Sequence, residues 1–200
     1  MEIVPSHLKP ALVNPRSYVK YVFDRGELRN SAREALERFN LSVGSKSYLC
    51  EVGLPEGEEI LEDSFRLGSS LLGKHLLTLS ALAEELSLPT PSHCRGALCL
   101  YLSKYGGVIV VDGARDDGVY SIGLERDYNA TLINSCAEKF GVFLALYVAH
   151  CRTTAPLPFE QRGEVDLKLE RCMYAIDPGA FGDPENWWST VLEEMMSGLR

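Results

Sequence analysis

The chain has 200 residues, of which 46% are hydrophobic and 24% charged, a balance that is ordinary for a soluble globular protein and argues against extensive disorder. A chain of this length buries about 70% of the surface that its unfolded form exposes, so its core needs no metal or disulfide. With 28 acidic and 20 basic side chains, the net charge is −8. This charge favours cationic partners and disfavours direct binding to nucleic acid, whose phosphates it would repel.

The beginning of the chain shows no sign of export or of membrane anchoring. Residues 1–13 lack a continuous apolar stretch with a cleavage site, and no segment approaches the run of about 18 apolar residues that would span a membrane. We therefore expect a cytoplasmic protein. In that reducing compartment the six cysteines should be free and mostly buried; they are Cys50, Cys94, Cys99, Cys136, Cys151 and Cys172.

The first half of the chain predicts a helix, two short strands and a second helix, at residues 31–39, 47–52, 59–66 and 76–86. Ser31 and Glu34 match a capping box, in which each side chain binds the other residue's backbone N–H at the start of a helix. The first strand is expected to stop at Gly53 and Pro55. The beginning of the second helix is rich in leucine and would equally suit an extended chain.

The middle of the chain predicts three adjacent antiparallel strands and a short fourth one, at residues 97–103, 108–112, 118–122 and 131–133. Turn residues, including Gly106 and Gly107, separate them. The second strand is almost continuously apolar from Val108 to Val111, which indicates a central strand that is covered on both faces.

The last third of the chain predicts three helices. Ser135 and Glu138 form a second capping box, and the following helix is apolar on two sides, so it should be the most buried. After a loop at residues 153–163, an apolar stripe predicts a helix over residues 165–176. The C-terminal helix should be amphipathic, with Asp183 as its N-cap and Trp188 on its buried stripe.

Strands in one block with helices on either side predict an α+β fold rather than α/β. We expect a single domain with a central, mostly antiparallel sheet packed by helices. Residues 1–45 form an N-terminal extension and first helix within this domain, and residues 46–200 form the rest.

Residues with catalytic or metal-binding chemistry are few. His93, Cys94 and Cys99, and likewise His150 and Cys151, lack the paired spacing of a closed zinc site. A cysteine–histidine nucleophilic pair would be disfavoured because every cysteine lies in or beside an apolar run, which opposes a thiolate. We therefore predict no catalytic residue, no metal site and no cofactor, and a protein that is not an enzyme.

A loop with several aspartates lies between the second and third strands. Asp112, Asp116, Asp117 and Gly118 resemble a calcium-binding loop, but the alternating oxygen ligands and the closing glutamate are missing. A hairpin loop with solvated charges is the better interpretation.

Acidic side chains are concentrated in two parts of the chain. Residues 51–66, the acidic segment, hold six carboxylates and one arginine, and residues 164–200 hold eight carboxylates and three basic residues. A solvated surface is the default interpretation of such clusters. Because the chain is already strongly acidic, we instead predict a docking surface for a cationic protein. The residues predicted to bind this partner are Glu56, Glu58, Glu59, Glu62, Asp63, Asp116 and Asp117.

Four short motifs, in this order and spacing, resemble the fourth family of the SUKH immunity-protein superfamily. They are Glu51-Val52-Gly53-Leu54-Pro55, the run 107–112 with Gly118-Val119, Ile133-Asn134-Ser135 before residues 140–147, and the run 183–194. The resemblance covers roughly residues 51–200. It implies an α+β domain that binds and neutralises a toxin of a bacterial polymorphic toxin system, without catalysis or cofactor. The motifs mark the scaffold, so the resemblance assigns no binding residue.

Two interpretations from other classes stay open. One is a regulatory scaffold of the same fold, which binds a cellular protein and inhibits nothing. A cysteine-dependent hydrolase is the third. For the immunity role, we expect the partner to be a cognate toxin that is itself basic, such as a nuclease, with no direct contact to nucleic acid or membrane. The sequence predicts no particular oligomeric state.

Overall fold

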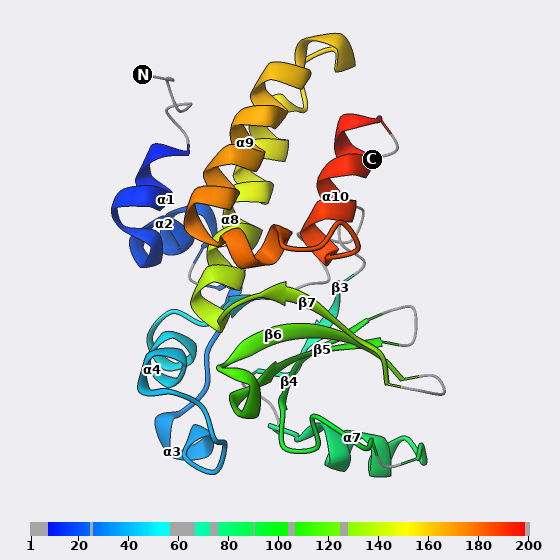
Figure 1. The fold of residues 1–200 in the computed structure, drawn as a ribbon. Coiled ribbons are helices and arrows are strands. Elements are labelled where there is room, and N and C mark those ends of the chain that lie inside the picture. Colours follow the sequence, from blue (N-terminus) through cyan, green and yellow to red (C-terminus); the bar gives the residue numbers. More distant parts are fainter. Residues whose placement is uncertain are drawn as a thin grey trace.

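The structure is a computed structural model that describes residues 8–24, 26–56, 67–72, 76–89, 91–103, 107–124 and 128–198, with backbone only for residues 67–69 and 103. Its centre is an antiparallel sheet with helices on both faces (Figure 1). The strands lie side by side in chain order: β3 (Leu67–Ser70), β4 (Leu98–Ser103), β5 (Gly107–Asp112), β6 (Gly118–Gly123) and β7 (Ala130–Asn134). The predicted α+β fold and the order of the three central strands are confirmed.

Strand β5 lies in the middle of this sheet and is covered on both faces. Its Ile109 and Val111 belong to the main core, whereas Val108 and Val110 belong to a second core beneath α7 (Leu79–Glu85). All four side chains are at most 3% exposed. Alternate residues of a strand point to opposite faces, so an unbroken apolar run was required here. The prediction of a central, doubly covered strand is confirmed.

The main core is built around α8 (Ala137–Thr154), in which 12 of 18 residues are buried. It is the most buried of the described helices, as predicted. The predicted capping box is wrong, because the N-cap is Cys136 and no side chain caps the helix. The Ser135 hydroxyl instead accepts a hydrogen bond from Lys139 Nζ at 2.8 Å.

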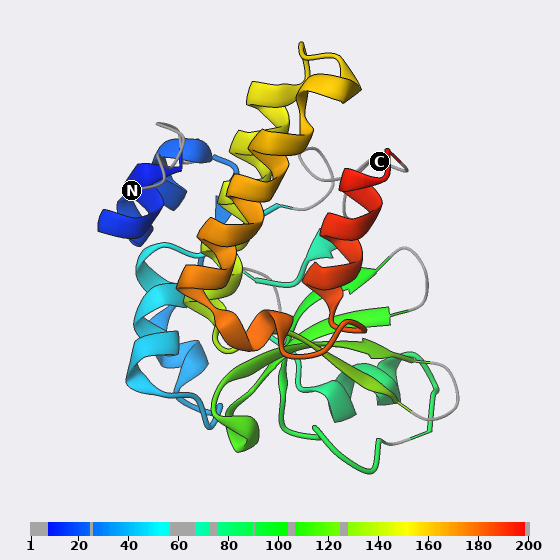
Figure 2. The same ribbon diagram turned by 45° about the horizontal axis from the view of Figure 1, so that its top comes forward.

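The helices α1 (Lys9–Val13) and α2 (Pro15–Val22) pack against the same core. Leu8, Tyr18 and Val19 are buried in the cluster that also contains α8 and α9 (Gly163–Ile176). Figure 2 shows α1 and α2 beside the antiparallel pair α8 and α9, which extends beyond the sheet. The described part of residues 1–45 therefore shares its core with the rest of the chain.

Two predictions in the first half of the chain are wrong. Residues 31–39 contain only the short helix α3 (Arg33–Leu36); its N-cap is Ala32, and the buried Ser31 hydroxyl makes no hydrogen bond to a described residue. Residues 47–52 belong to a helix, α4 (Val43–Glu51), rather than a strand. The Ser42 hydroxyl caps α4 by accepting a hydrogen bond from the Ser45 N–H at 3.2 Å.

Other short elements join these helices to the sheet. Strands β1 (Leu28–Arg29) and β2 (Leu54–Pro55) form a separate antiparallel pair. The predicted helix at residues 76–86 is confirmed as α7, and the residues before it are extended, with Thr78 bridged to Leu98. The strand predicted at residues 59–66 lies outside the described residues.

The C-terminal part also begins differently from the prediction. The helix α10 (Trp187–Met196) has Asn186 as its N-cap, whereas the Asp183 carboxylate accepts a hydrogen bond from the Glu185 N–H in the preceding turn. The short helices η2 (Phe159–Gln161) and η3 (Pro178–Phe181) precede and follow α9. None of the helices in the described ranges combines the length and apolarity that a membrane crossing requires.

Candidate protein-binding surface

The acidic segment begins at the end of α4, where Glu51 takes part in an ion-pair cluster. The Arg16 guanidinium, on α2, donates to Glu138 Oε2 at 2.8 Å and to Glu51 Oε2 at 3.2 Å. It also donates to the Ser47 hydroxyl at 3.1 Å. The Glu51 side chain is 55% exposed and shares this arginine with Glu138, so it keeps part of its charge available to a partner.

Glu56 has a structural role. Its Oε2 accepts a hydrogen bond from Arg29 Nε at 2.7 Å, and its Oε1 accepts one from the Ser70 N–H at 2.9 Å. The carboxylate therefore ties β1 to the edge strand β3, and the side chain is only 21% exposed. Sequence reasoning missed both Arg16 and Arg29 because each lies more than 25 residues from its acidic partner. The next four predicted residues, Glu58, Glu59, Glu62 and Asp63, lie outside the described residues.

The two predicted aspartates of the β5–β6 hairpin face different surroundings. Asp116 is exposed, with a left-handed backbone at φ 52°. Asp117 is 6% exposed, and its carboxylate accepts hydrogen bonds from the Ser42 N–H at 3.0 and 3.2 Å. The expectation of solvated charges therefore fails for Asp117, and also for Asp112, which is 4% exposed and accepts a hydrogen bond from the Ala114 N–H.

The hairpin and the described beginning of the acidic segment lie at opposite ends of α4. Asp117 binds Ser42 just before this helix, whereas Glu56 follows it and the strand β2. A nine-residue helix is about 14 Å long, so Asp116 lies at a distance from Glu51 and Glu56, the described carboxylates of the acidic segment.

The acidic surface predicted at residues 164–200 is smaller than expected. Asp166 is buried against His150, with 2.7 Å between Oδ1 and Nε2, so it joins α9 to α8. Asp177 is also buried, and it accepts hydrogen bonds from Asn134 Nδ2 and from the Ser135 N–H. Both carboxylates hold the fold together and are withdrawn from solvent.

Burial opposes the thiolate form of the candidate nucleophiles Cys94 and Cys99. All six cysteines are free, as predicted, and three of them, Cys94, Cys99 and Cys172, are buried. Burial, assisted by a hydrogen bond to Asp112, raises the pKa of Cys94 to about 11, and burial raises the pKa of Cys99 to about 12. His93 lies with Nε2 against the Tyr128 carbonyl at 2.7 Å rather than beside a thiol. Cys94 and Cys99 therefore lack the lowered pKa that activates a cysteine nucleophile.

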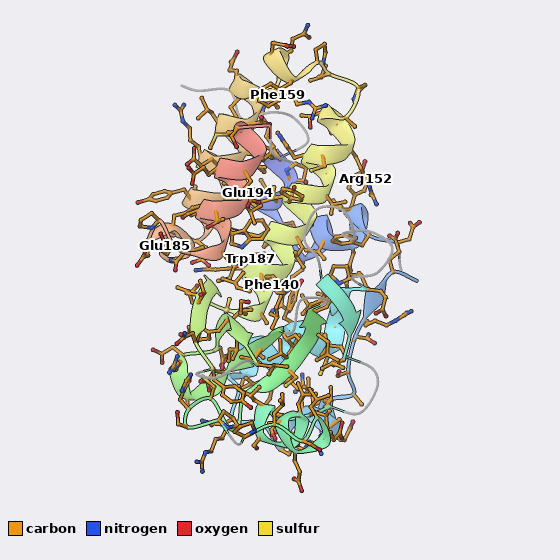
Figure 3. The ribbon with its side chains drawn as sticks, turned by 90° about the vertical axis from the view of Figure 1, so that its right-hand side faces the viewer. Phe140, Arg152, Phe159, Glu185, Trp187 and Glu194 are labelled. Atoms are coloured by element: carbon orange, nitrogen blue, oxygen red, sulfur yellow. The ribbon has the colours of Figure 1, made fainter. Side chains whose placement is uncertain are left out.

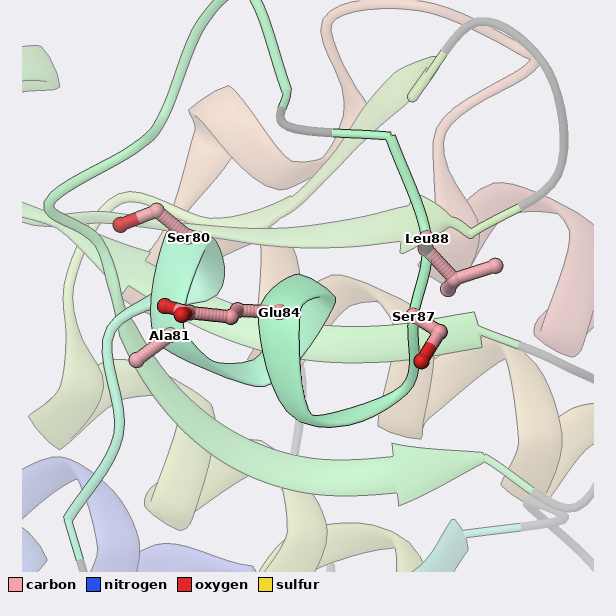
Figure 4. Close-up of a pocket in the computed structure, with 5 residues that line it drawn as sticks. All are labelled: Ser80, Ala81, Glu84, Ser87 and Leu88. Carbon is pink, nitrogen blue, oxygen red and sulfur yellow. The ribbon is translucent and has the colours of Figure 1, made fainter.

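Two further features bear on chemistry. Among the described residues, no three His, Cys, Asp or Glu side chains are placed to hold a metal ion together. A hollow of about 690 Å³ lies beside α7, lined by Ser80, Ala81, Glu84, Ser87 and Leu88 (Figure 4). These five residues supply one carboxylate, that of Glu84, two hydroxyls and no second acid–base group. This arrangement offers hydrogen bonds to a ligand but no pair for general acid–base catalysis.

A buried polar network fixes the C-terminal helix on the sheet. The Trp188 indole donates to Asn134 Oδ1 at 2.9 Å, and Asn134 in turn donates to Asp177. The Trp188 ring also packs against Phe143, with 5.3 Å between the centroids, and its neighbour Trp187 lies near Phe140 (Figure 3). The motif residues Asn134 and Trp188 therefore serve the scaffold.

Comparison with known proteins identifies the family of the chain. A search of curated proteins and a search of solved structures gave no match. The model of the SUKH-4 immunity protein family matches residues 15–194, which include α2, the whole sheet and nearly all of α10. The chain therefore belongs to the SUKH-4 immunity protein family.

Proposed function

We propose that this protein binds and neutralises a toxin domain of a bacterial polymorphic toxin system. The observation that carries the proposal is membership of an immunity protein family, established over residues 15–194. The protein would act in the cytoplasm as a stoichiometric inhibitor that uses neither catalysis nor a cofactor. The neutral thiols and the structural use of Asp166 and Asp177 support a binding role over an enzymatic one.

The proposed toxin is cationic, as a nuclease would be. A net charge of −8 attracts such a partner over long range and speeds the encounter. The proposed contact surface is the acidic segment, beginning at the exposed Glu51. Glu58, Glu59, Glu62 and Asp63 supply its further charges, and Asp116 flanks it.

Two of the predicted residues take a different role in this proposal. Glu56 is engaged by Arg29 and Ser70, so its carboxylate joins β1 to β3 and is not part of the proposed contact. Asp117 is buried and anchors α4, so it lies beneath the surface. A substitution at either position would disturb the scaffold before it reported on binding.

Growth rescue with purification of the complex tests this function. The toxin domain encoded beside this gene is expressed from an inducible promoter in cells with or without the protein. We expect growth to be restored, and the two chains to elute as a 1:1 complex whose mass light scattering measures. An unrelated toxin domain is the control and should still kill. A complex without protection would instead favour the regulatory scaffold. The absence of both a complex and protection would refute the proposal.

A further inference from the structure

A groove of about 500 Å³ lies between the N-terminal helices and α8. We call it the α2 groove; its lining residues are Pro10, Tyr18, Tyr21, Val22, Ala149, Arg152 and Thr153. Tyr18 and Val22 form its buried floor, and Tyr21 stands at the rim with 84% of its surface exposed. The lining is largely aromatic and aliphatic, so the groove suits an apolar side chain.

The surroundings of the groove are apolar and basic. Val13 is 85% exposed and Leu12 is 45% exposed. Together with Tyr21, they make three of the large exposed apolar side chains in the described residues, and all three belong to α1 and α2. Residues 8–23 contain three basic and no acidic side chains, although the whole chain carries a charge of −8. Isolated apolar side chains on a surface are normal, whereas a cluster beside a hollow indicates binding.

Arg152 is fixed at the edge of the groove. Its Nη1 donates a hydrogen bond to the Val22 carbonyl at 2.9 Å, at the C-terminal end of α2. Figure 3 shows Arg152 on the side of α8 that borders the N-terminal helices. One bond leaves most of the N–H donors of the guanidinium available, and a positioned guanidinium recognises carboxylates with specific geometry.

The α2 groove and the exposed Glu51 of the acidic segment both border α2. Arg16, at the beginning of α2, holds Glu51 at 3.2 Å, and Tyr21 lies five residues later on the same helix. Five residues of helix span about 8 Å along the axis and about 140° around it, so the two side chains lie on different flanks of α2. A protein interface typically covers about 800 Å² on each partner, or about 30 Å across, so one partner would cover both regions.

We propose that the α2 groove is the second half of the toxin-binding interface. It receives an apolar side chain of the toxin that has carboxylates of the toxin on either side. The inference rests on the proposed function. The surface is then acidic at one end and apolar and basic at the other, so the toxin carries the opposite arrangement. Such a pairing fixes the orientation of the complex, because a reversed toxin would place like charges together.

Dissociation rates of the complex test the groove. Tyr21→Ala removes an exposed aromatic anchor, and Arg152→Glu reverses the fixed charge. The matched controls are Tyr174→Ala, which removes another exposed tyrosine, and Arg95→Glu, whose arginine also donates to one backbone carbonyl, that of Pro91. The probe is the catalytically inactive toxin domain encoded beside this gene, immobilised for surface binding. Thermal unfolding of each variant shows that it is folded.

The groove variants should dissociate about 10- to 100-fold faster than the wild type, with association little changed, and the controls should match the wild type. If the wild type binds and the groove variants dissociate at its rate, the groove proposal is wrong while the proposed function stands. If the wild type does not bind, both are wrong.

Two other occupants of the groove would show in parallel measurements. A dimer in sedimentation that Tyr21→Ala converts to a monomer, at an unchanged toxin dissociation rate, would assign the groove to a second copy of the chain. Pelleting of the wild type with phosphatidylglycerol vesicles, lost in Tyr21→Ala at an unchanged toxin dissociation rate, would assign it to a membrane. Either result would overturn the assignment to the toxin.

Discussion

Trp188 and Asn134 are both fully buried and are joined by a hydrogen bond of 2.9 Å from the indole Nε1 to Oδ1 of the amide. Asn134 ends β7, and Trp188 lies in the first turn of α10, 54 residues later. The amide also donates to the buried Asp177 carboxylate, which accepts from the Ser135 N–H. This one bond therefore attaches the C-terminal helix to a sheet edge through a network whose loss would leave buried polar groups unpaired.

Replacement of Trp188 should destabilise the protein strongly. Trp188→Ala leaves a large cavity and an unpaired Asn134 amide oxygen, so we expect a loss of about 3 to 5 kcal/mol in the free energy of unfolding. Trp188→Phe fills most of the space but removes the donor, and should cost less. Urea unfolding measures both. An unchanged free energy of unfolding in Trp188→Ala would mean that the indole is not buried as the structure shows.

Stability should fall as the pH falls below about 6.5 because of His150. Burial lowers the pKa of His150 below its ordinary 6.5, and the hydrogen bond with Asp166 opposes this effect in part. As the pH falls below 6.5, the unfolded chain binds a proton at His150 before the folded chain does. The stabilisation from His150 is therefore complete above pH 6.5 and is lost as the pH decreases. The slope is at most about 1.4 kcal/mol per pH unit.

Urea unfolding between about pH 5.5 and 7.5 would reveal this dependence. His150→Gln should lower the stability at neutral pH and flatten the slope. His93→Gln, at a partly exposed histidine outside the main core, is the control and should keep the slope of the wild type. An equal slope in His150→Gln and the wild type would assign the pH dependence to other groups.

Gly141 should resist a substitution that normally favours helices. Alanine stabilises a helix interior by about 1 kcal/mol relative to glycine. In α8, however, a Cβ at Gly141 would lie 1.8 Å from the hydroxyl of Tyr48, which is fully buried. Gly141→Ala should therefore destabilise the protein by about 1 to 3 kcal/mol. Gly163→Ala, where a Cβ would meet nothing within 4 Å, is the control and should leave stability unchanged or raise it.

Chelators should not affect stability. The described residues hold no cluster of metal ligands, and the core is large enough to fold without one. Thermal unfolding with and without EDTA, together with elemental analysis, checks this prediction. About one zinc per chain would contradict it.

Apolar patterns predicted the elements that are buried on both sides. The runs in β5 and α8 were identified because full burial leaves no polar position to interrupt them. Capping signals were less reliable. The Ser31, Ser135 and Asp183 side chains all form no cap, whereas Ser42 caps α4 without the glutamate that completes a capping box. A single serine is too common to identify a helix start, so the sequence predicts a strand at residues 47–52 where the chain forms α4.

The binding surface was less predictable because charge is visible in a sequence while its partners are not. Asp117 and Glu56 are indistinguishable in sequence from solvated acids, yet each is bound by groups distant in the chain. The α2 groove had a weak signal, namely the absence of acidic residues from 8 to 23 in an acidic chain. Its hollow depends on how α2 meets α8, which local patterns do not encode.

The association rate with the toxin tests most directly whether the acidic segment captures a cationic partner. Stopped-flow mixing compares the wild type with a triple reversal, Glu58→Lys, Glu59→Lys and Glu62→Lys, over a range of salt concentrations. Reversal of three carboxylates on the C-terminal helical surface, Glu170, Glu185 and Glu193, is the control with the same change in net charge.

We expect the triple reversal in the acidic segment to slow association by about one to two orders of magnitude, and added salt to slow the wild type. The C-terminal reversal should have a much smaller effect, because its carboxylates are not part of the proposed contact. Equal association rates for the wild type and the triple reversal in the acidic segment would contradict the account.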